Sequence, residues 1–203
     1  MSKNKISKNW LTKQRRDLYV RKSQSEGYRS RAIYKLKEMD DKYNILKNGI
    51  SLIDLGAAPG SWSQYAAKKI KKGKILSIDL LSMDKIENTF QIKGDFMEES
   101  CQQEIKKYFN NKVDVILSDM AVNTTGNKYI DSISTGELSL SAMKFSKEIL
   151  KSKGIFISKF FMGSAFNDII KNAKKTFLQV RIYKPKASKK ESKENYLVCK
   201  TML

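Results

Sequence analysis

The stretch from Ser51 to Tyr65 constrains the fold more than any other part of the chain. It runs Ser-Leu-Ile-Asp-Leu-Gly-Ala-Ala-Pro-Gly-Ser-Trp-Ser-Gln-Tyr, so a short apolar run ends in a turn bounded by Gly56 and Gly60, and a helical pattern follows. A buried strand that passes through a glycine-rich turn into a helix is where α/β sheets bind nucleotide-like ligands. The stretch therefore predicts an α/β fold with a ligand site at this turn.

The composition of this turn argues against the commonest nucleotide ligands. A dinucleotide-binding turn carries the pattern G-x-G-x-x-G, whose glycines let the backbone approach a pyrophosphate. Two alanines and a proline separate Gly56 from Gly60, which favours an uncharged adenosine-bearing ligand and disfavours a dehydrogenase. Asp79 closes the next predicted strand, 19 residues beyond Gly60, where a carboxylate can bind ribose hydroxyls.

Apolar runs and helical patterns alternate along the rest of the chain. Helices are expected at 29–43, 62–70, 98–109, 135–150 and 165–177. Strands are expected at 52–55, 75–80, 90–92, 113–117, 154–159, 178–183 and 196–202. This order predicts a mostly parallel, seven-stranded sheet with helices on both faces and an antiparallel pair of strands at the C-terminal end. Residues 1–27 are predicted to form a basic N-terminal extension, and residues 28–203 a single domain.

The positive charge is concentrated in the two terminal segments. The formal net charge is +19, of which +9 falls in residues 1–49 and +8 in residues 171–203, while residues 50–170 carry only +2. An A/T-rich genome also favours lysine, but it would spread lysine evenly along the chain. The uneven distribution predicts a face that binds a polyanion, with RNA or DNA as the partner.

Missing residue types exclude several kinds of chemistry. The chain has no histidine, so Ser-His or Cys-His catalysis and a histidine-ligated metal are excluded, and no metal is expected. A general base must then be Lys, Asp, Glu, Tyr or Cys. No apolar run approaches 18 residues, so no membrane segment is expected. Two cysteines outside any metal-ligand spacing indicate a reducing compartment, the cytoplasm, although the basic N-terminus also fits an organellar presequence.

Charged residues close the predicted strands at the edge where α/β sheets bind ligands. The strand-closing residues are Asp54, Asp79, Asp95, Asp119 and Lys159. Charges so close to a core are costly unless they are paired or used in function. The alternative explanation is a structural salt bridge, for instance between Asp119 and Lys159 on neighbouring strands.

Seven segments in a fixed order carry a resemblance to a known family. The segments are 29–36, 54–65, 79–84, 94–96, 118–123, 158–161 and 192–196. In this combination the chain resembles, from about Asn9 to Lys200, the FtsJ/RrmJ family of S-adenosylmethionine-dependent ribosomal RNA 2'-O-methyltransferases. It departs from the family pattern at Ser61, where a glycine is usual, and at Val122, where a proline is usual.

The resemblance implies a Rossmann-like class I methyltransferase fold, S-adenosylmethionine as cofactor, and a uridine ribose of large-subunit ribosomal RNA as substrate. It implies a catalytic set of Lys35, Asp119, Lys159 and Glu194. It implies cofactor contacts at Gly60, Trp62, Asp79, Asp95 and Asp119. The glycine-rich turn adds Gly56 to these contacts. Core packing is the alternative for Trp62, and capping of a turn is the alternative for Asp95. A monomer that acts on the large ribosomal subunit is expected.

Within this set, Lys159 is the best candidate for the base that takes the ribose hydroxyl proton. A free lysine has a pKa of about 10.4, and burial beside another cation can bring it near 7–8. Lys35 can supply that cation, Asp119 can orient Lys159, and Glu194 can hold Lys35 or the ribose.

The predicted RNA contacts lie near both ends of the chain. They are Arg29, Arg31, Lys186, Lys189 and Lys190. A solvated helix face or a merely soluble loop is the alternative for these residues. Two rival functions also remain open at this point, a tRNA ribose 2'-O-methyltransferase and a non-catalytic RNA-binding ribosome-assembly factor.

Overall fold

One seven-stranded sheet forms the centre of the protein. The computed structural model describes residues 17–122 and 125–203. The strands are β1 (Ser51–Leu55), β2 (Lys74–Asp79), β3 (Phe90–Lys93), β4 (Val113–Ser118), β5 (Leu150–Phe161), β6 (Phe177–Tyr183) and β7 (Glu194–Met202). Their order across the sheet is β3-β2-β1-β4-β5-β7-β6, and β7 runs opposite to the other six strands. The expected sheet is confirmed.

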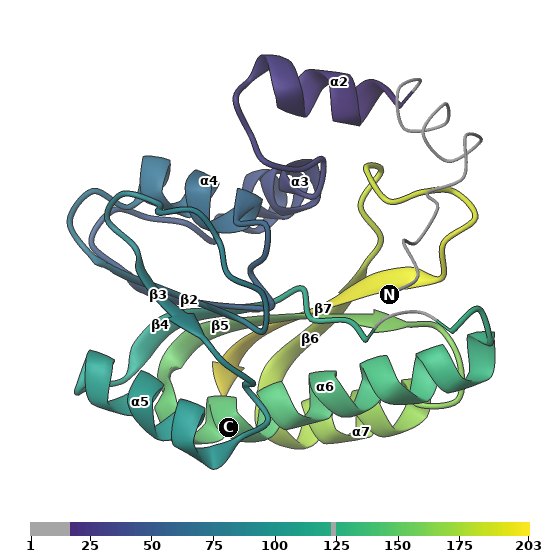
Figure 1. The fold of residues 1–203 in the computed structure, drawn as a ribbon. Helices are drawn as coiled ribbons and strands as arrows, with labels where there is room; N and C mark the ends of the chain where they lie inside the picture. Colours follow the sequence, from purple (N-terminus) through teal and green to yellow (C-terminus); the bar gives the residue numbers. More distant parts are fainter. Residues whose placement is uncertain (1–16, 123–124) are drawn as a thin grey trace, which may run out of the picture.

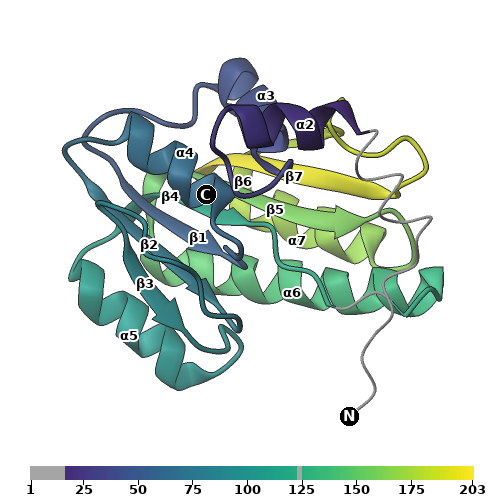
Figure 2. The ribbon, with the colours of Figure 1, turned by 45° about the horizontal axis from the view of Figure 1, so that its top comes forward.

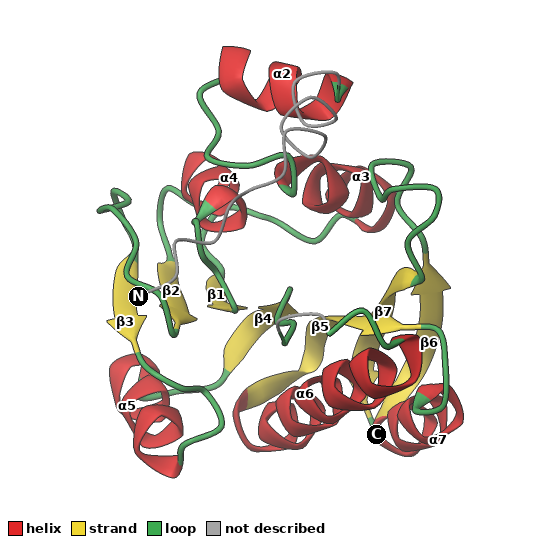
Figure 3. Cartoon of the chain, turned by 45° about the vertical axis from the view of Figure 1, so that its right-hand side comes forward, coloured by secondary structure: helices red, strands yellow, loops and turns green. Residues whose placement is uncertain are grey.

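Helices cover both faces of this sheet, as expected (Figures 1 and 3). The helices are α2 (Leu18–Ser25), α3 (Ile33–Tyr43), α4 (Ser61–Lys69), α5 (Glu99–Phe109), α6 (Lys128–Ile149) and α7 (Phe166–Thr176). In Figure 1, α2, α3 and α4 lie above the sheet, and α5, α6 and α7 lie below it. In the described ranges 17–122 and 125–203, no helix combines the length and apolar character needed to cross a membrane.

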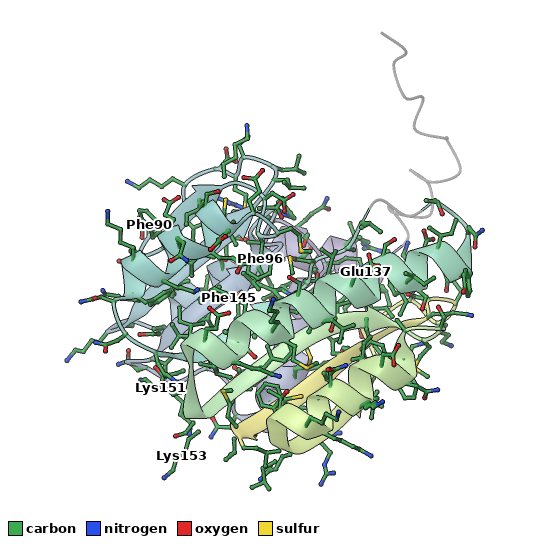
Figure 4. All side chains as sticks on the ribbon, turned by 90° about the horizontal axis from the view of Figure 1, so that it is seen from below. Phe90, Phe96, Glu137, Phe145, Lys151 and Lys153 are labelled. Carbon is green, nitrogen blue, oxygen red and sulfur yellow. The ribbon has the colours of Figure 1, made fainter. Side chains whose placement is uncertain are left out.

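The alternation of side chains along the strands divides the core into two parts. Leu52 points into the cluster under α3 and α4, whereas Ile53 and Leu55 point into the cluster on the side of α5, α6 and α7. In the second cluster the rings of Phe96 and Phe145 pack edge to face, with centroids 5.3 Å apart (Figure 4). Both faces of the sheet are therefore buried, as a mostly parallel sheet requires.

Four elements differ most from the sequence-based prediction. Helix α3 begins at Ile33 and not at residue 29. Helix α6 begins at Lys128 and not near residue 135, because the side chain of Asn127 caps it by accepting from the amides of Tyr129 and Ile130. Strand β5 is longer than the expected 154–159, since it follows α6 without a loop and runs through Phe161.

Helix α2 lies within the predicted basic extension and was not expected. Asp17 caps it by accepting from the amides of Tyr19 and Val20. The ring of Tyr19 packs against that of Tyr34 on α3, with centroids 5.3 Å apart, and Asp17 forms an ion pair with Arg31. The remaining part of the extension, residues 1–16, lies outside the described residues, and the division at residue 28 stays a prediction.

Candidate active site

The glycine-rich turn after β1 is shaped by a close approach of two backbone segments. Gly56 has φ +72, and a Cβ at this position would lie 2.7 Å from the Cα of Met120 in the loop after β4. The amides of Gly56 and Ala57 donate to the carbonyl of Ile78 at 2.9 and 3.1 Å. Only glycine fits this conformation and this contact without strain.

Gly60 ends the turn and begins α4. It has φ +105 and serves as the N-cap residue, with no side-chain hydrogen bond to the first turn of the helix. The amides of Ser61 and Trp62, at the start of α4, have no partner within the helix, and amides at this position of a helix can bind a ligand.

The acids that close β2 and β3 also fold the turns around them. Asp79 accepts from the amide of Ala58 through Oδ2 and from the amide of Leu81 through Oδ1, both at 2.9 Å. Asp95 accepts from the amide of Met97 at 2.8 Å, which is the turn cap foreseen as the alternative. Each carboxylate oxygen has a further lone pair, so these contacts leave both acids able to accept from a ligand.

The Trp62 side chain packs in the core. Its indole is only 3% exposed, its Nε1 donates to the carbonyl of Ala32 at 2.8 Å, and its ring lies 5.8 Å from that of Tyr196. This is core packing, the alternative considered for this residue, and the cofactor contact at Trp62 stays a prediction.

Two ion pairs bring the four predicted catalytic residues together. Lys159 Nζ, on β5, lies 3.0 Å from Asp119 Oδ1 and also donates to the backbone carbonyl of Asp119. Lys35 Nζ, on α3, lies 2.7 Å from Glu194 Oε2 at the start of β7. Lys159 and Glu194 are 7% and 8% exposed, so both pairs are largely withdrawn from water.

Tyr196 connects the two ion pairs, and the sequence analysis assigned it no role. It pairs with Lys159 across β5 and β7, its hydroxyl donates to Asp119 Oδ1 at 2.7 Å, and Lys35 Nζ lies 5.8 Å from its ring centroid. Burial raises its pKa well above the usual value, so the hydroxyl remains a donor. Its spacing of two residues from Glu194 on one strand was the available signal, because such residues share a face.

Charges in the site oppose the effect of burial. Burial alone would raise the pKa of Asp119, but the ammonium groups of Lys159 and Lys35 hold that pKa below its usual value. Burial alone would lower the pKa of Lys35, but the carboxylates of Asp119 and Glu194 raise it above its usual value. Lys35 therefore keeps its charge at neutral pH.

A cavity of about 210 Å³ opens beside the pair of Lys35 and Glu194. It is lined by Arg31, Ala32, Lys35, Ala187, Lys189, Ser192 and Glu194. A larger, polar cavity of about 380 Å³ lies between α5 and α6 and contains none of the predicted catalytic residues. Of these two cavities, the smaller one borders the pair of Lys35 and Glu194, and it is not lined by Lys159 or Asp119.

Two of the five predicted RNA contacts are engaged within the protein. The Arg29 guanidinium donates to the carbonyls of Pro59, Asp84 and Lys85 at 3.1, 2.9 and 3.1 Å. Arg31 pairs with Asp17 and donates to the carbonyl of Ala187. The structure thus gives both arginines the role of joining segments of the chain, and neither extends a free guanidinium into solvent.

The other three predicted RNA contacts lie on the loop between β6 and β7. Lys186, Lys189 and Lys190 are exposed there. They are free to meet a polyanion at the entrance to the smaller cavity, which Lys189 lines.

Asp54 is a buried acid on β1, just before the glycine-rich turn. Asp54 is 0% exposed, its Oδ2 accepts from the Ser63 hydroxyl at 2.5 Å, and its Oδ1 has no hydrogen-bond partner among the described residues. Burial is the main cause that raises the pKa of Asp54 to about 7. The folded protein thus binds a proton here more tightly than the unfolded chain does.

Replacement of Asp54 by asparagine should remove one pH dependence of stability. The pKa is raised on folding, so the contribution of Asp54 is complete below about pH 4 and is lost as the pH rises through 7. The free energy of unfolding of the wild type, relative to Asp54→Asn, should fall by roughly 2–3 kcal/mol between pH 5 and pH 8. Urea denaturation at four pH values measures this, and parallel profiles would contradict it.

The fold of this protein has counterparts among solved structures. Human methyltransferase-like protein 13, solved in complex with SAH, superposes with a TM-score of 0.56 at 14% identity over 75% of this chain and 72% of that chain. At that identity the likeness shows the fold alone, which is the Rossmann-like fold of methyltransferases.

The family follows from closer matches. The family model described as FtsJ-like methyltransferase matches residues 28–202, so the chain belongs to this family. The ribosomal RNA large subunit methyltransferase E of Pelagibacter ubique is 59% identical over 100% of both chains, and that of Legionella pneumophila strain Corby is 45% identical over 98% of both. A crystal structure described as a ribosomal RNA methyltransferase from Plasmodium falciparum has a TM-score of 0.78 at 38% identity, over 87% of this chain and 99% of that chain.

Proposed function

We propose that this protein transfers a methyl group from S-adenosylmethionine to the 2'-hydroxyl of a uridine in large-subunit ribosomal RNA. The observation that carries the proposal is the buried pair of Lys159 and Asp119, set beside the pair of Lys35 and Glu194 at an open cavity. The names of the full-length relatives support ribosomal RNA of the large subunit as the substrate. The expected partner is the large ribosomal subunit, and the expected compartment is the cytoplasm.

The residues along the edge of the sheet fit the proposed cofactor. Asp79 and Asp95 keep free lone pairs for ribose hydroxyls and an adenine amino group, and the first two amides of α4 have no partner within the helix. Leu80, Leu81 and Met97 are exposed beside these acids and offer apolar surface to a base. When bound, S-adenosylmethionine supplies a methyl group carried on a positively charged sulfur, and the buried carboxylate of Asp119 suits a nearby cation.

The four residues then divide the work of the reaction. Lys159 acts as the neutral amine, after it has released a proton, and its Nζ accepts the proton of the ribose hydroxyl. Both the carboxylate and the carbonyl of Asp119 fix the direction of that nitrogen. Lys35 stays protonated and donates to the oxygen that loses its proton. Glu194 holds Lys35 in place, and the Tyr196 hydroxyl holds Asp119.

The substrate is tested by transfer of tritium from labelled S-adenosylmethionine into large ribosomal subunits, naked ribosomal RNA and total tRNA. Label in the large subunit or in its RNA supports the proposal. Label confined to tRNA would keep the site and overturn the substrate. An absence of label from all three, with cofactor binding intact, would favour the non-catalytic assembly factor.

Replacement of Arg29 by alanine is expected to weaken cofactor binding and to leave RNA binding nearly unchanged. Its three hydrogen bonds join the glycine-rich turn at Pro59 to the segment at Asp84 and Lys85, so their loss loosens the walls of the cofactor site. The expected increase in the Kd for S-adenosylmethionine is about ten-fold. Calorimetry measures the affinity for the cofactor, and a filter-binding assay measures the affinity for RNA. A variant that is impaired only in RNA binding would contradict this prediction and would indicate that Arg29 contacts a phosphate of the RNA.

A further inference from the structure

The loop at residues 184–193 joins β6 to β7 and lies next to α3 (Figures 1 and 2). We call it the basic loop, because it exposes Lys186, Lys189 and Lys190. It forms neither helix nor strand, so its shape depends on contacts made by individual side chains. A loop with so little regular structure needs such contacts to hold its lysines in one arrangement.

One acidic side chain of α3, Glu38, accepts hydrogen bonds from two consecutive amides of the basic loop. Glu38 Oε2 accepts from the amide of Lys186 at 2.6 Å, and Oε1 accepts from the amide of Ala187 at 2.8 Å. The hydroxyl of Tyr183, at the end of β6, also donates to Oε2 at 3.4 Å. Hydrogen bonds to an ionised acceptor are stronger than neutral ones, and this carboxylate uses both oxygens.

The same loop is connected to the catalytic residues. Ser188 donates from its hydroxyl to Glu194 Oε1 at 2.7 Å, while Glu194 Oε2 binds Lys35. Lys35 and Glu38 are three residues apart on α3, so they lie on neighbouring positions of one helix face. The basic loop is thus held by Glu38 of α3 and by Glu194 of the ion pair that borders the cavity.

We propose that Glu38 is a positioning residue that holds the basic loop in the shape that presents its lysines to RNA. The proposal rests on the proposed function, because it takes RNA as the substrate. Electrostatics alone gives the opposite expectation, since a carboxylate under a basic surface repels a polyanion and its removal should tighten binding. The sign of the change in RNA affinity therefore separates a clamp from a mere surface charge.

The test compares Glu38→Gln with Glu26→Gln. Glutamine replaces one of the two carboxylate oxygens by an NH₂ group, which cannot accept from an amide, so the two hydrogen bonds of the carboxylate cannot both be kept in place. Glu26 pairs with Lys37 of α3 at 2.7 Å and, among residues 17–122 and 125–203, forms no hydrogen bond or ion pair with the basic loop. Its replacement therefore removes the same charge without releasing the loop. Glu38→Gln should weaken RNA binding and raise the KM for RNA about ten-fold, with kcat within about three-fold of wild type.

The matched variant should bind RNA as tightly as wild type or more tightly. An affinity of Glu38→Gln equal to that of Glu26→Gln would overturn the proposal. Amide hydrogen exchange adds a readout that needs no activity, since the amides of Lys186 and Ala187 should exchange faster in Glu38→Gln only. If the wild type methylates no RNA, the proposed function fails, while RNA affinity and amide exchange still decide on Glu38. Unchanged exchange at both amides would also overturn the clamp.

Discussion

Replacement of Lys159 by alanine is expected to lower the rate of methyl transfer by about 10²–10⁴-fold, which is the usual contribution of a positioned general base. Lys159 Nζ is held by the carboxylate and the carbonyl of Asp119, and Lys35 keeps its own proton because its pKa is raised. No other amine is placed to take over among the four predicted catalytic residues. Cofactor affinity should change little, because the contacts proposed for the cofactor lie mainly at the ends of β1, β2 and β3.

The matched control for this variant is Lys153→Ala. Lys153 lies on the same strand as Lys159 but is exposed at its other end, as Figure 4 shows. Single-turnover transfer with excess enzyme measures the chemical step, and calorimetry measures cofactor affinity. If Lys159→Ala transfers the methyl group as fast as Lys153→Ala does, Lys159 is not the general base. Loss of cofactor binding together with transfer would point to a binding role for Lys159.

Replacement of Asp119 by asparagine is expected to remove transfer and to destabilise the fold. The change leaves the largely buried ammonium of Lys159 without its carboxylate and takes one of two acids away from Lys35. Breaking a buried pair in this way costs about 3–5 kcal/mol. The pKa of Asp119 is held below its usual value, so this stabilisation is present at neutral pH and fades as the pH falls below about 4.

An aspartate on β4, the strand that Asp119 follows, provides the control for that effect. Asp114 pairs with Lys151 at 2.8 Å, but both side chains are substantially exposed. Asp114→Asn should therefore change the free energy of unfolding by less than about 1 kcal/mol and leave transfer unaffected. Urea denaturation at pH 7 compares the two variants. An equal loss of stability in both, or wild-type transfer by Asp119→Asn, would contradict the assigned role of Asp119.

The sheet and the position of the site were predictable because strong local signals mark them. Apolar runs that end in Asp79, Asp119 and Lys159 locate the strand ends, and parallel strands bring those ends to one edge. The sequence resemblance placed Lys35 and Glu194 with them, although they are 159 residues apart. Neither residue has a local pattern that predicts its partner.

Other features depend on contacts that leave no pattern in the sequence. Arg29 and Glu38 bind backbone groups, and any residue type can supply a carbonyl or an amide. An RNA contact was predicted for Arg29 from its place one turn ahead of Lys35, and nothing in the sequence marks the three carbonyls that its guanidinium binds. Helix α6 begins early because a single residue, Asn127, caps a segment whose composition is otherwise typical of a loop.

The identity of the methylated nucleoside tests the central claim most directly. RNA from large subunits incubated with the protein and labelled S-adenosylmethionine is digested to nucleosides, which are separated and identified by mass spectrometry. The account predicts that the label is found in 2'-O-methyluridine and is lost with Lys159→Ala. Label on a base, or on the ribose of another nucleoside, would contradict it.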